Sequence, residues 1–256
     1  MRQRPPLALV APAAVAVLLL LLPLFGLLER TPWSALPDLL GKAQVRQALW
    51  LSVRCASAAT ALSVLVGVPL AWVLARSHLP GRRLLRGFVT VPLVLPPVVG
   101  GVALLLAFGR RGVLGHLLVG AGAVPAFTTY GVILAETFVA MPFLVVTVEG
   151  ALASLPPVPE EVAATLGAGP WRVFRTVTLP AVLPALGAGA ALSAARALGE
   201  FGATVTFNGS LPGSTQTVPS AIYALLQDDP PAAYALSAVL LVVSVSLILA
   251  LRGRLR

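Results

Sequence analysis

Residues 161–180 read EVAATLGAGPWRVFRTVTLP and form a polar stretch inside an otherwise apolar chain. Pro159 and the two Glu residues after it favour the first turn of a helix, which the small residues Gly167–Gly169 then stop. A second short helix follows, on which Trp171 and Phe174 lie three positions apart and share one face. We predict a helix–turn–helix elbow whose apolar side chains fit a groove on a partner; an ordinary amphipathic surface loop is the alternative.

The composition is that of a polytopic membrane protein. The chain has 256 residues, of which 58% are hydrophobic and 11% are charged, and its mean hydropathy is +0.94. A bilayer core about 30 Å thick needs roughly 20 apolar residues per helical span, and segments of this kind recur along the sequence. We therefore expect an all-α fold, a helix bundle surrounded by membrane lipid, with a single transmembrane domain over residues 1–256.

Six apolar segments are long enough to cross a bilayer. The first follows a basic tip, and no A-x-A site comes after it, which favours a retained helix over a cleaved signal peptide. The predicted spans are residues 7–28, 48–75, 88–108, 127–149, 181–203 and 232–251.

The basic residues orient this bundle, because Lys and Arg are enriched in cytoplasmic segments. With the N-terminus inside, eleven basic residues fall in inside segments and five in outside segments. Both termini and the loop at 150–180 are therefore predicted to be cytoplasmic, which places the elbow where a cytoplasmic partner could reach it. The inside residues are Arg2, Arg4, Arg76, Arg82, Arg83, Arg86, Arg172, Arg175, Arg252, Arg254 and Arg256, and the outside residues are Arg30, Lys42, Arg46, Arg110 and Arg111.

The third span contains residues that break a helix. Pro92, Pro96 and Pro97 lack a backbone N–H, and Gly100-Gly101 follow them. Broken backbone within a membrane persists only where it is buried in protein or lines a watery cavity. Pro96 and Pro97 are therefore candidates for a segment that lines a transport pathway, with a kink that eases helix packing as the alternative.

Four ionisable residues fall within the predicted spans, namely Arg54, Glu136, Arg196 and Glu200. Such charges are costly in lipid, and they pair with one another or face a cavity. Arg196 and Glu200 are four positions apart on one helix face and can pair locally. We hypothesise an ion-paired network at the outer gate of a pathway, and the gate candidates include the nearby Thr204; a static structural staple is the alternative.

Several chemistries are excluded by what the chain lacks. Its one cysteine, Cys55, forms no intrachain disulfide, and its two histidines are far apart, so we expect no metal site and no catalytic cluster. The only lysine, Lys42, is followed by Ala43 rather than Ser or Thr, so there is no phosphate-binding P-loop. The arginines lie at the ends of apolar spans, which argues against nucleic-acid binding despite a net charge of +9. We expect a transport subunit that is not an enzyme and has no cofactor of its own; a secondary transporter, which would carry an inverted repeat, is the competing class.

The spacing of Glu161-Val162-Ala163, Gly167, Val177 and Leu179-Pro180 resembles the EAA motif of bacterial ABC importer permeases. The chain departs from that pattern through Val162, where the motif has Ala, and Val177, where it has Ile. The resemblance implies the type I ABC importer permease fold with six transmembrane helices, and a loop that docks on a pair of separate subunits that bind ATP. The coupling residues that it implies are Glu161, Ala163, Gly167, Trp171, Phe174, Leu179 and Pro180.

A second stretch, ARALGEFGAT at residues 195–204 with QTVP at 216–219, resembles molybdate permeases. Sulfate and tungstate permeases are similar through the first part of it, so they remain alternatives. The resemblance implies import of molybdate by alternating access, an extracytoplasmic molybdate-binding protein, a homodimer of this chain, and location in the inner membrane of a bacterial or archaeal cell. Within the loop at 204–231, residues 222–226 are a short apolar helix candidate that we expect to cap the outer opening or to meet a binding protein; a plain surface loop is the alternative.

Overall fold

The computed structural model describes residues 7–253, and within them the chain is helical apart from turns and connections. The all-α prediction is confirmed for this range. In chain order the elements are α1 (Leu7–Arg30), a 3₁₀ turn (Trp33–Ala35), α2 (Leu36–Gly41), α3 (Ala43–Arg76), α4 (Arg82–Val94), α5 (Pro97–Phe108), α6 (Gly115–Gly120), α7 (Thr129–Ser154), α8 (Val158–Thr165), α9 (Pro170–Val173), a π-helical turn (Phe174–Thr178), α10 (Leu179–Leu198), α11 (Gly202–Asn208), α12 (Val218–Asp228) and α13 (Pro230–Gly253).

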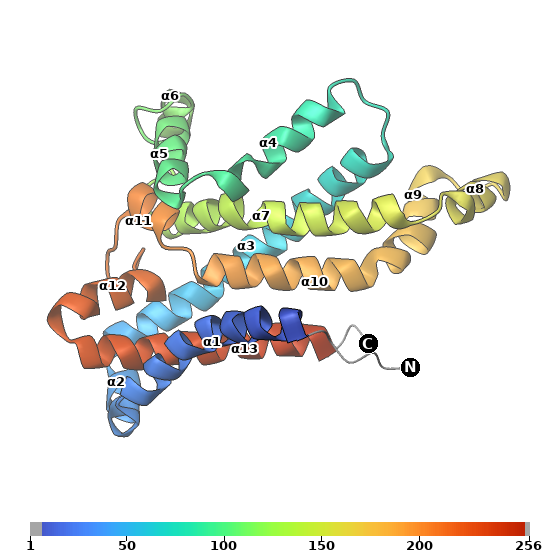
Figure 1. The fold of residues 1–256 in the computed structure, drawn as a ribbon. Coiled ribbons are helices and arrows are strands. Elements are labelled where there is room, and N and C mark those ends of the chain that lie inside the picture. The colour runs from blue at the N-terminus through green and yellow to red at the C-terminus, as the bar shows by residue number, and fades with distance from the viewer. Residues whose placement is uncertain (1–6, 254–256) are drawn as a thin grey trace.

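The long helices α3, α7 and α10 lie side by side at the centre of the bundle (Figure 1). Small residues such as Ala59 and Ala140, both fully buried, allow their backbones to approach closely. A Cβ on Gly67 would lie 3.1 Å from Leu144 Cδ2, and a Cβ on Gly189 would lie 3.2 Å from Leu144 Cα. The two glycines therefore let α3 and α10 close on the same residue of α7.

Four helical stretches are long and apolar enough to cross a membrane, or five if a bent pair counts as one crossing. They are Ala8–Arg30, Ala43–Arg76, Thr129–Ser154 and Pro170–Leu198, and they correspond to the first, second, fourth and fifth predicted spans. The sixth predicted span lies on α13, a helix of 24 residues whose described apolar segment is Pro230–Ser246. The described residues thus confirm a multi-pass helical protein but do not reproduce the count of six crossings.

The third predicted span consists of two helices. α4 and α5 are bent by 119° across a break at Leu95 and Pro96. Both break residues are extended, with ψ of 134° and 133°, because a residue before proline avoids the α region and proline supplies no N–H. The predicted interruption is confirmed, and its first helix begins at Arg82 rather than at 88.

The fifth predicted span ends earlier than expected. α10 stops at Leu198, and Gly199–Phe201 separate it from α11. The carboxylate of Glu200 accepts a hydrogen bond of 2.7 Å from the backbone N–H of Ala203, so it caps the start of α11 instead of continuing α10. The predicted end at 203 is therefore wrong, and Glu200 lies in a break between two helices.

The segment predicted as a cap or a surface loop, residues 204–231, folds into α11, α12 and a connection that is exposed at Leu211 and buried at Thr215 and Thr217. Thr215 and Thr217 in that connection are each 1% exposed. The Val218 N–H at the start of α12 donates a hydrogen bond of 2.8 Å to Ser52 Oγ on α3. A plain surface loop is therefore wrong for this segment, because it packs against the first part of α3.

The two ends of the bundle differ (Figure 1). α8, α9 and the start of α4 lie at one end, toward which the start of α1 and the end of α13 also point, whereas α2, α6 and α12 lie at the other. The elbow and the basic segment 76–86 therefore share one end. Arg2, Arg4, Arg254 and Arg256, on which the predicted orientation partly depends, lie outside the described residues.

Candidate functional site

The turn of the elbow is a hydrogen-bonded helix end. Gly167 has a φ of +85°, in the left-handed region that disfavours residues with a Cβ. Its N–H donates to the Ala164 carbonyl at 3.0 Å, and the Ala168 N–H donates to the Ala163 carbonyl at 3.1 Å. These bonds make a Schellman motif, which satisfies the last carbonyls of α8 before the chain turns into α9. The four-residue spacing between Ala163 and Gly167 is therefore the spacing that this hydrogen-bonded helix end requires.

The elbow carries apolar side chains on its outer surface. Val162, Leu166 and Trp171 are 52%, 83% and 72% exposed, and exposed apolar groups gathered in one place mark contact surfaces. Trp171 stacks on Phe174 with ring centroids 5.6 Å apart. Phe174 is half-buried and, together with Trp72 of α3, lines an apolar cavity. The docking role of Trp171 stays a prediction, while Phe174 contacts the bundle.

Leu179 and Pro180 lie where the elbow enters the bundle. The π-helical turn Phe174–Thr178 ends with a hydrogen bond from the Leu179 N–H to the first carbonyl of that turn. Pro180 lacks an N–H, and its ring crowds the carbonyl of Thr176, so a wider turn accommodates it. The helical stretch runs without interruption over Pro170–Leu198. The second helix of the elbow is therefore the beginning of a membrane helix, whereas the sequence suggested a separate short helix.

An ionic contact ties the elbow to the end of α3. Arg76 Nε lies 3.4 Å from Glu160 Oε2, and Glu160 Oε1 accepts a hydrogen bond of 2.8 Å from Thr178 Oγ1. Arg76 Nη2 also donates to the Leu155 carbonyl, just beyond the end of α7, at 3.2 Å. These contacts were not predicted, because the sequence marks Arg76 only as a basic residue at a helix end.

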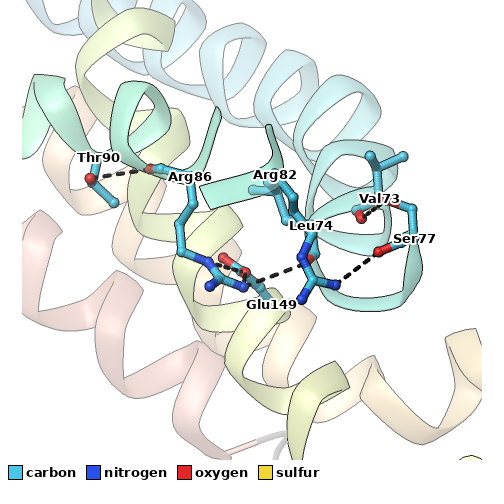
Figure 2. A network of polar contacts seen from close by, with 7 residues as sticks. All are labelled: Val73, Leu74, Ser77, Arg82, Arg86, Thr90 and Glu149. Carbon is cyan, nitrogen blue, oxygen red and sulfur yellow. Dashed lines mark hydrogen bonds and ion pairs between the residues drawn. The ribbon is translucent and has the colours of Figure 1, made fainter. Parts of the chain in front are cut away.

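A second polar network joins α4 to α7 and α3 (Figure 2). Arg86 Nε donates to Glu149 Oε1 at 2.7 Å, and Arg86 Nη2 donates to the Leu74 carbonyl at 3.4 Å. Arg82 donates to the Ser77 carbonyl at 2.9 Å. This network was also missed, although an acid such as Glu149 at the end of an apolar span, on the same side as a basic segment, was an available signal.

Arg196 and Glu200 form the ion pair that their spacing predicts. Arg196 Nη2 lies 2.7 Å from Glu200 Oε2, as an ionic contact outside hydrogen-bond alignment. Glu200 is fully buried, and its other oxygen accepts from the Ala203 N–H. One buried carboxylate thus joins the last turn of α10 to the first turn of α11.

Glu136 and Arg54 stand apart from this pair. Glu136 is buried in α7, and its Oε2 has no hydrogen-bond partner among the described residues. Arg54 is exposed on α3 and forms no ion pair with another residue of the range 7–253. The four-residue network of the hypothesis is therefore reduced to one ion pair, Arg196 with Glu200.

α5 and α11 approach closely because glycine lies on both sides of their contact. A Cβ on Gly101 would lie 2.7 Å from Thr206 Cβ, and a Cβ on Gly202 would lie 2.7 Å from Pro97 Cβ. The break in the third span and the break after α10, far apart in the sequence, therefore meet. This contact brings Pro97 to the segment that holds Glu200.

The other two gate candidates differ in their surroundings. Pro96 is exposed, as a residue that lines a pathway or a contact would be. Thr204 is buried, and its hydroxyl donates to the Phe201 carbonyl at 2.8 Å, so it secures the first turn of α11. In the part of the chain that the structure describes, no three His, Cys, Asp or Glu side chains are grouped to hold a metal ion.

Residues 67–254 match the family of binding-protein-dependent transport system inner membrane components. The matched range includes the elbow, both polar networks and the Arg196–Glu200 pair. The chain belongs to this family. It is accordingly a multi-pass inner membrane protein and a transport component that is not an enzyme.

Individual relatives are similar over most of their length. The chain is 48% identical over 243 residues to the molybdenum transport system permease protein ModB of Mycobacterium tuberculosis, covering 95% of this chain and 92% of that protein. It is 37% identical over 235 residues to the sulfate transport system permease protein CysT of Salmonella typhimurium, covering 90% and 85%. A solved bacterial alginate ABC transporter, in complex with its alginate pentasaccharide-bound periplasmic protein, contains a chain with a TM-score of 0.77 at 17% identity, covering 97% of this chain and 93% of that one. The last likeness concerns the fold alone.

Proposed function

We propose that this chain is the membrane-spanning permease subunit of an ATP-driven importer of molybdate. The observation that carries the proposal is the 48% identity to a molybdenum transport permease over 95% of the chain. Identity to a sulfate transport permease is lower, at 37%. The oxyanion would cross the bundle by alternating access, without any change to its bonds.

The elbow is the proposed docking site for a subunit that binds ATP. The exposed side chains of Val162, Leu166 and Trp171 support this role. ATP would be bound and hydrolysed by that subunit, since this chain has no P-loop. Each chain supplies one elbow, and a pair of ATP-binding subunits would need two, so we propose a homodimer.

We propose six crossings per chain, with both termini and the elbow in the cytoplasm. In this topology α4 and α5 together make the third crossing and α13 makes the sixth. Two observations support this topology. One end of the bundle holds the elbow and the basic segment 76–86, and the start of α1 and the end of α13 point toward it (Figure 1). Basic residues are also in excess on the predicted inside. An extracytoplasmic binding protein would then deliver molybdate at the opposite end, where α2, α6 and α12 lie.

The proposed outer gate lies where α5 meets the break between α10 and α11. Ionisable groups at membrane depth mark pathways, because their cost in lipid is otherwise uncompensated. Glu200 holds α10 and α11 together in this structure, while the Arg196 side chain is 28% exposed and could meet an anion once the pair opens. Glu136, Pro96, Pro97 and Thr204 complete the candidates around this break.

Two other functions compete with this one. A permease for another tetrahedral oxyanion, tungstate or sulfate, is favoured by the identity to the sulfate relative. A secondary anion transporter would need no ATP-binding subunit, but it leaves the exposed elbow without a role.

Uptake of labelled molybdate tests the proposal in cells that lack this chain and in the same cells complemented with it. We expect accumulation to be lost on deletion and restored by the chain, with strong competition from tungstate and weak competition from sulfate. Normal molybdate accumulation in the deleted cells, combined with failed sulfate uptake, would overturn the substrate. Uptake that survives ATP depletion but stops with an ionophore would favour a secondary transporter.

A further inference from the structure

We propose that Glu160 is the residue that links the elbow mechanically to the membrane helices, with Arg76 and Thr178 as its two attachment points. The inference rests on the proposed function, since a link of this kind matters only if a subunit moves the elbow. Glu160 would be a positioning residue, because it touches neither ATP nor the transported anion.

The first observation is that α8 makes few other contacts that fix its position on the bundle. None of its residues is buried, so apolar packing contributes little to its position. Within residues 7–253, Glu160 is the residue of α8 whose side chain forms an ion pair or a side-chain hydrogen bond with another element. A displacement of α8 therefore reaches the bundle through the backbone turns at its two ends, through its contact with the π-helical turn, and through this carboxylate.

The second observation is that the carboxylate uses a different oxygen for each neighbour. Oε1 accepts the hydrogen bond from Thr178, at 2.8 Å, and Oε2 lies 3.4 Å from Arg76 Nε. Thr178 is buried at the end of the π-helical turn that enters α10, whereas Arg76 is the last residue of α3. A planar carboxylate thus fixes the start of α10 relative to the end of α3.

Arg76 extends the link to a third helix. Its Nη2 group donates to the Leu155 carbonyl at the C-cap of α7, at 3.2 Å. The side chains of Arg76 and Glu160 are only 17% and 21% exposed, so water screens their attraction less than at an open surface. Helices α3, α7 and α10 form the centre of the bundle. The end of α3, the end of α7 and the start of α10 are therefore all connected, directly or through Arg76, to Glu160.

The two neighbouring acids of α8, Glu160 and Glu161, have different surroundings. Glu161 is exposed and has no ion pair in the described part of the chain, so its side chain is free to meet the ATP-binding subunit. Glu160, one residue earlier, is turned toward the bundle. Neighbours on a helix point about 100° apart, which lets one acid serve the docked partner and the other serve the membrane helices.

The test uses the whole transporter, with its ATP-binding subunit and binding protein, reconstituted in proteoliposomes. We would measure molybdate transported per ATP hydrolysed, together with the amount of ATP-binding subunit that co-purifies. Glu160→Gln, Arg76→Gln and Thr178→Val should each lower the transport-to-hydrolysis ratio about fivefold or more, with co-purification unchanged. The double variant Arg76→Glu with Glu160→Arg should recover part of the loss, because the pair is re-formed with its charges exchanged.

Matched controls separate linkage from general damage. Thr176→Val removes an exposed hydroxyl two residues before Thr178, and Glu29→Gln removes an exposed carboxylate near the end of α1; both should keep the parental ratio. A parental ratio in Glu160→Gln would overturn the inference, as would loss of co-purification in that variant, which would make Glu160 a docking residue. If instead the unmodified chain fails to co-purify with an ATP-binding subunit, the proposed function is what fails.

Discussion

Arg86 of α4 and Glu149 of α7 are joined by a hydrogen bond of 2.7 Å between the guanidinium Nε and the carboxylate Oε1 (Figure 2). α4 has no buried residue, yet Glu149 itself is buried. The first half of the broken span is therefore held on the bundle by a charged contact in addition to the packing of the partly buried Val89.

Replacing Arg86 by Gln should loosen α4. The change leaves a buried carboxylate without its partner, which we expect to lower the free energy of unfolding by about 1–3 kcal/mol. Thermal unfolding of the protein in detergent and protease cleavage near residue 81 measure this. Arg83→Gln, an exposed position on the same helix, is the control and should behave as the parent. Equal stability of Arg86→Gln and Arg83→Gln would contradict the role of the contact.

Adding a methyl group at Gly101 should separate α5 from α11. The new Cβ would lie 2.7 Å from Thr206 Cβ and 2.8 Å from the Ala203 carbonyl oxygen, and overpacking of this kind costs about 1–3 kcal/mol. Gly150→Ala is the control, because nothing lies within 4 Å of its added Cβ. The midpoint of thermal unfolding should fall for Gly101→Ala only; a fall of the same size in both would mean that the contact is not the cause.

Substitution of Gly167 tests the turn of the elbow. No atom lies within 4 Å of a Cβ built there, so only its φ of +85° opposes a side chain. Asn tolerates this region better than Ala, and a β-branched residue tolerates it worst. Uptake and co-purification of the ATP-binding subunit should therefore fall least in Gly167→Asn, more in Gly167→Ala and most in Gly167→Val. The left-handed backbone conformation should cost about 1–2 kcal/mol with Ala at this position. Similar behaviour of all three would show that the left-handed turn is dispensable.

Variants of Glu200 can separate its ionic contact with Arg196 from the hydrogen bond that it accepts from the Ala203 N–H. Glu200→Gln keeps an acceptor for the Ala203 N–H but removes the charge, whereas Glu200→Leu removes both. Uptake should fall moderately in the first variant and severely in the second. Exchanging the residues, as Arg196→Glu with Glu200→Arg, should restore uptake only in part, since arginine has no acceptor for that N–H. Parental uptake in both single variants of Glu200 would end the gate hypothesis.

Features that depend on near neighbours in the chain were predictable. The stop at Gly167, the break at Leu95-Pro96 and the pairing of Arg196 with Glu200 each follow from interactions within a few residues. The end of α10 was mistaken because an acid four residues after Arg196 suits a continuing helix as well as it suits a cap. Which of these the chain adopts depends on the packing of α11 against α5.

Features that join distant segments were not predictable. The sequence marks Arg76 and Arg86 as basic residues at helix ends, and nothing in it says that Glu160 and Glu149 are their partners. The same holds for Gly101 and Gly202, whose lack of a side chain has a meaning only once α5 and α11 are seen in contact.

The sequence by itself determined that the chain is a helical membrane protein, that a polar elbow interrupts it, and that it contains no P-loop motif, because these depend on composition, on local backbone preference and on short motifs. The tertiary structure decided how the elbow is attached, which charges are paired, and which two breaks in the membrane helices meet. Those choices come from long-range packing, in which the burial of each charged group is set by helices that the chain brings together from far apart.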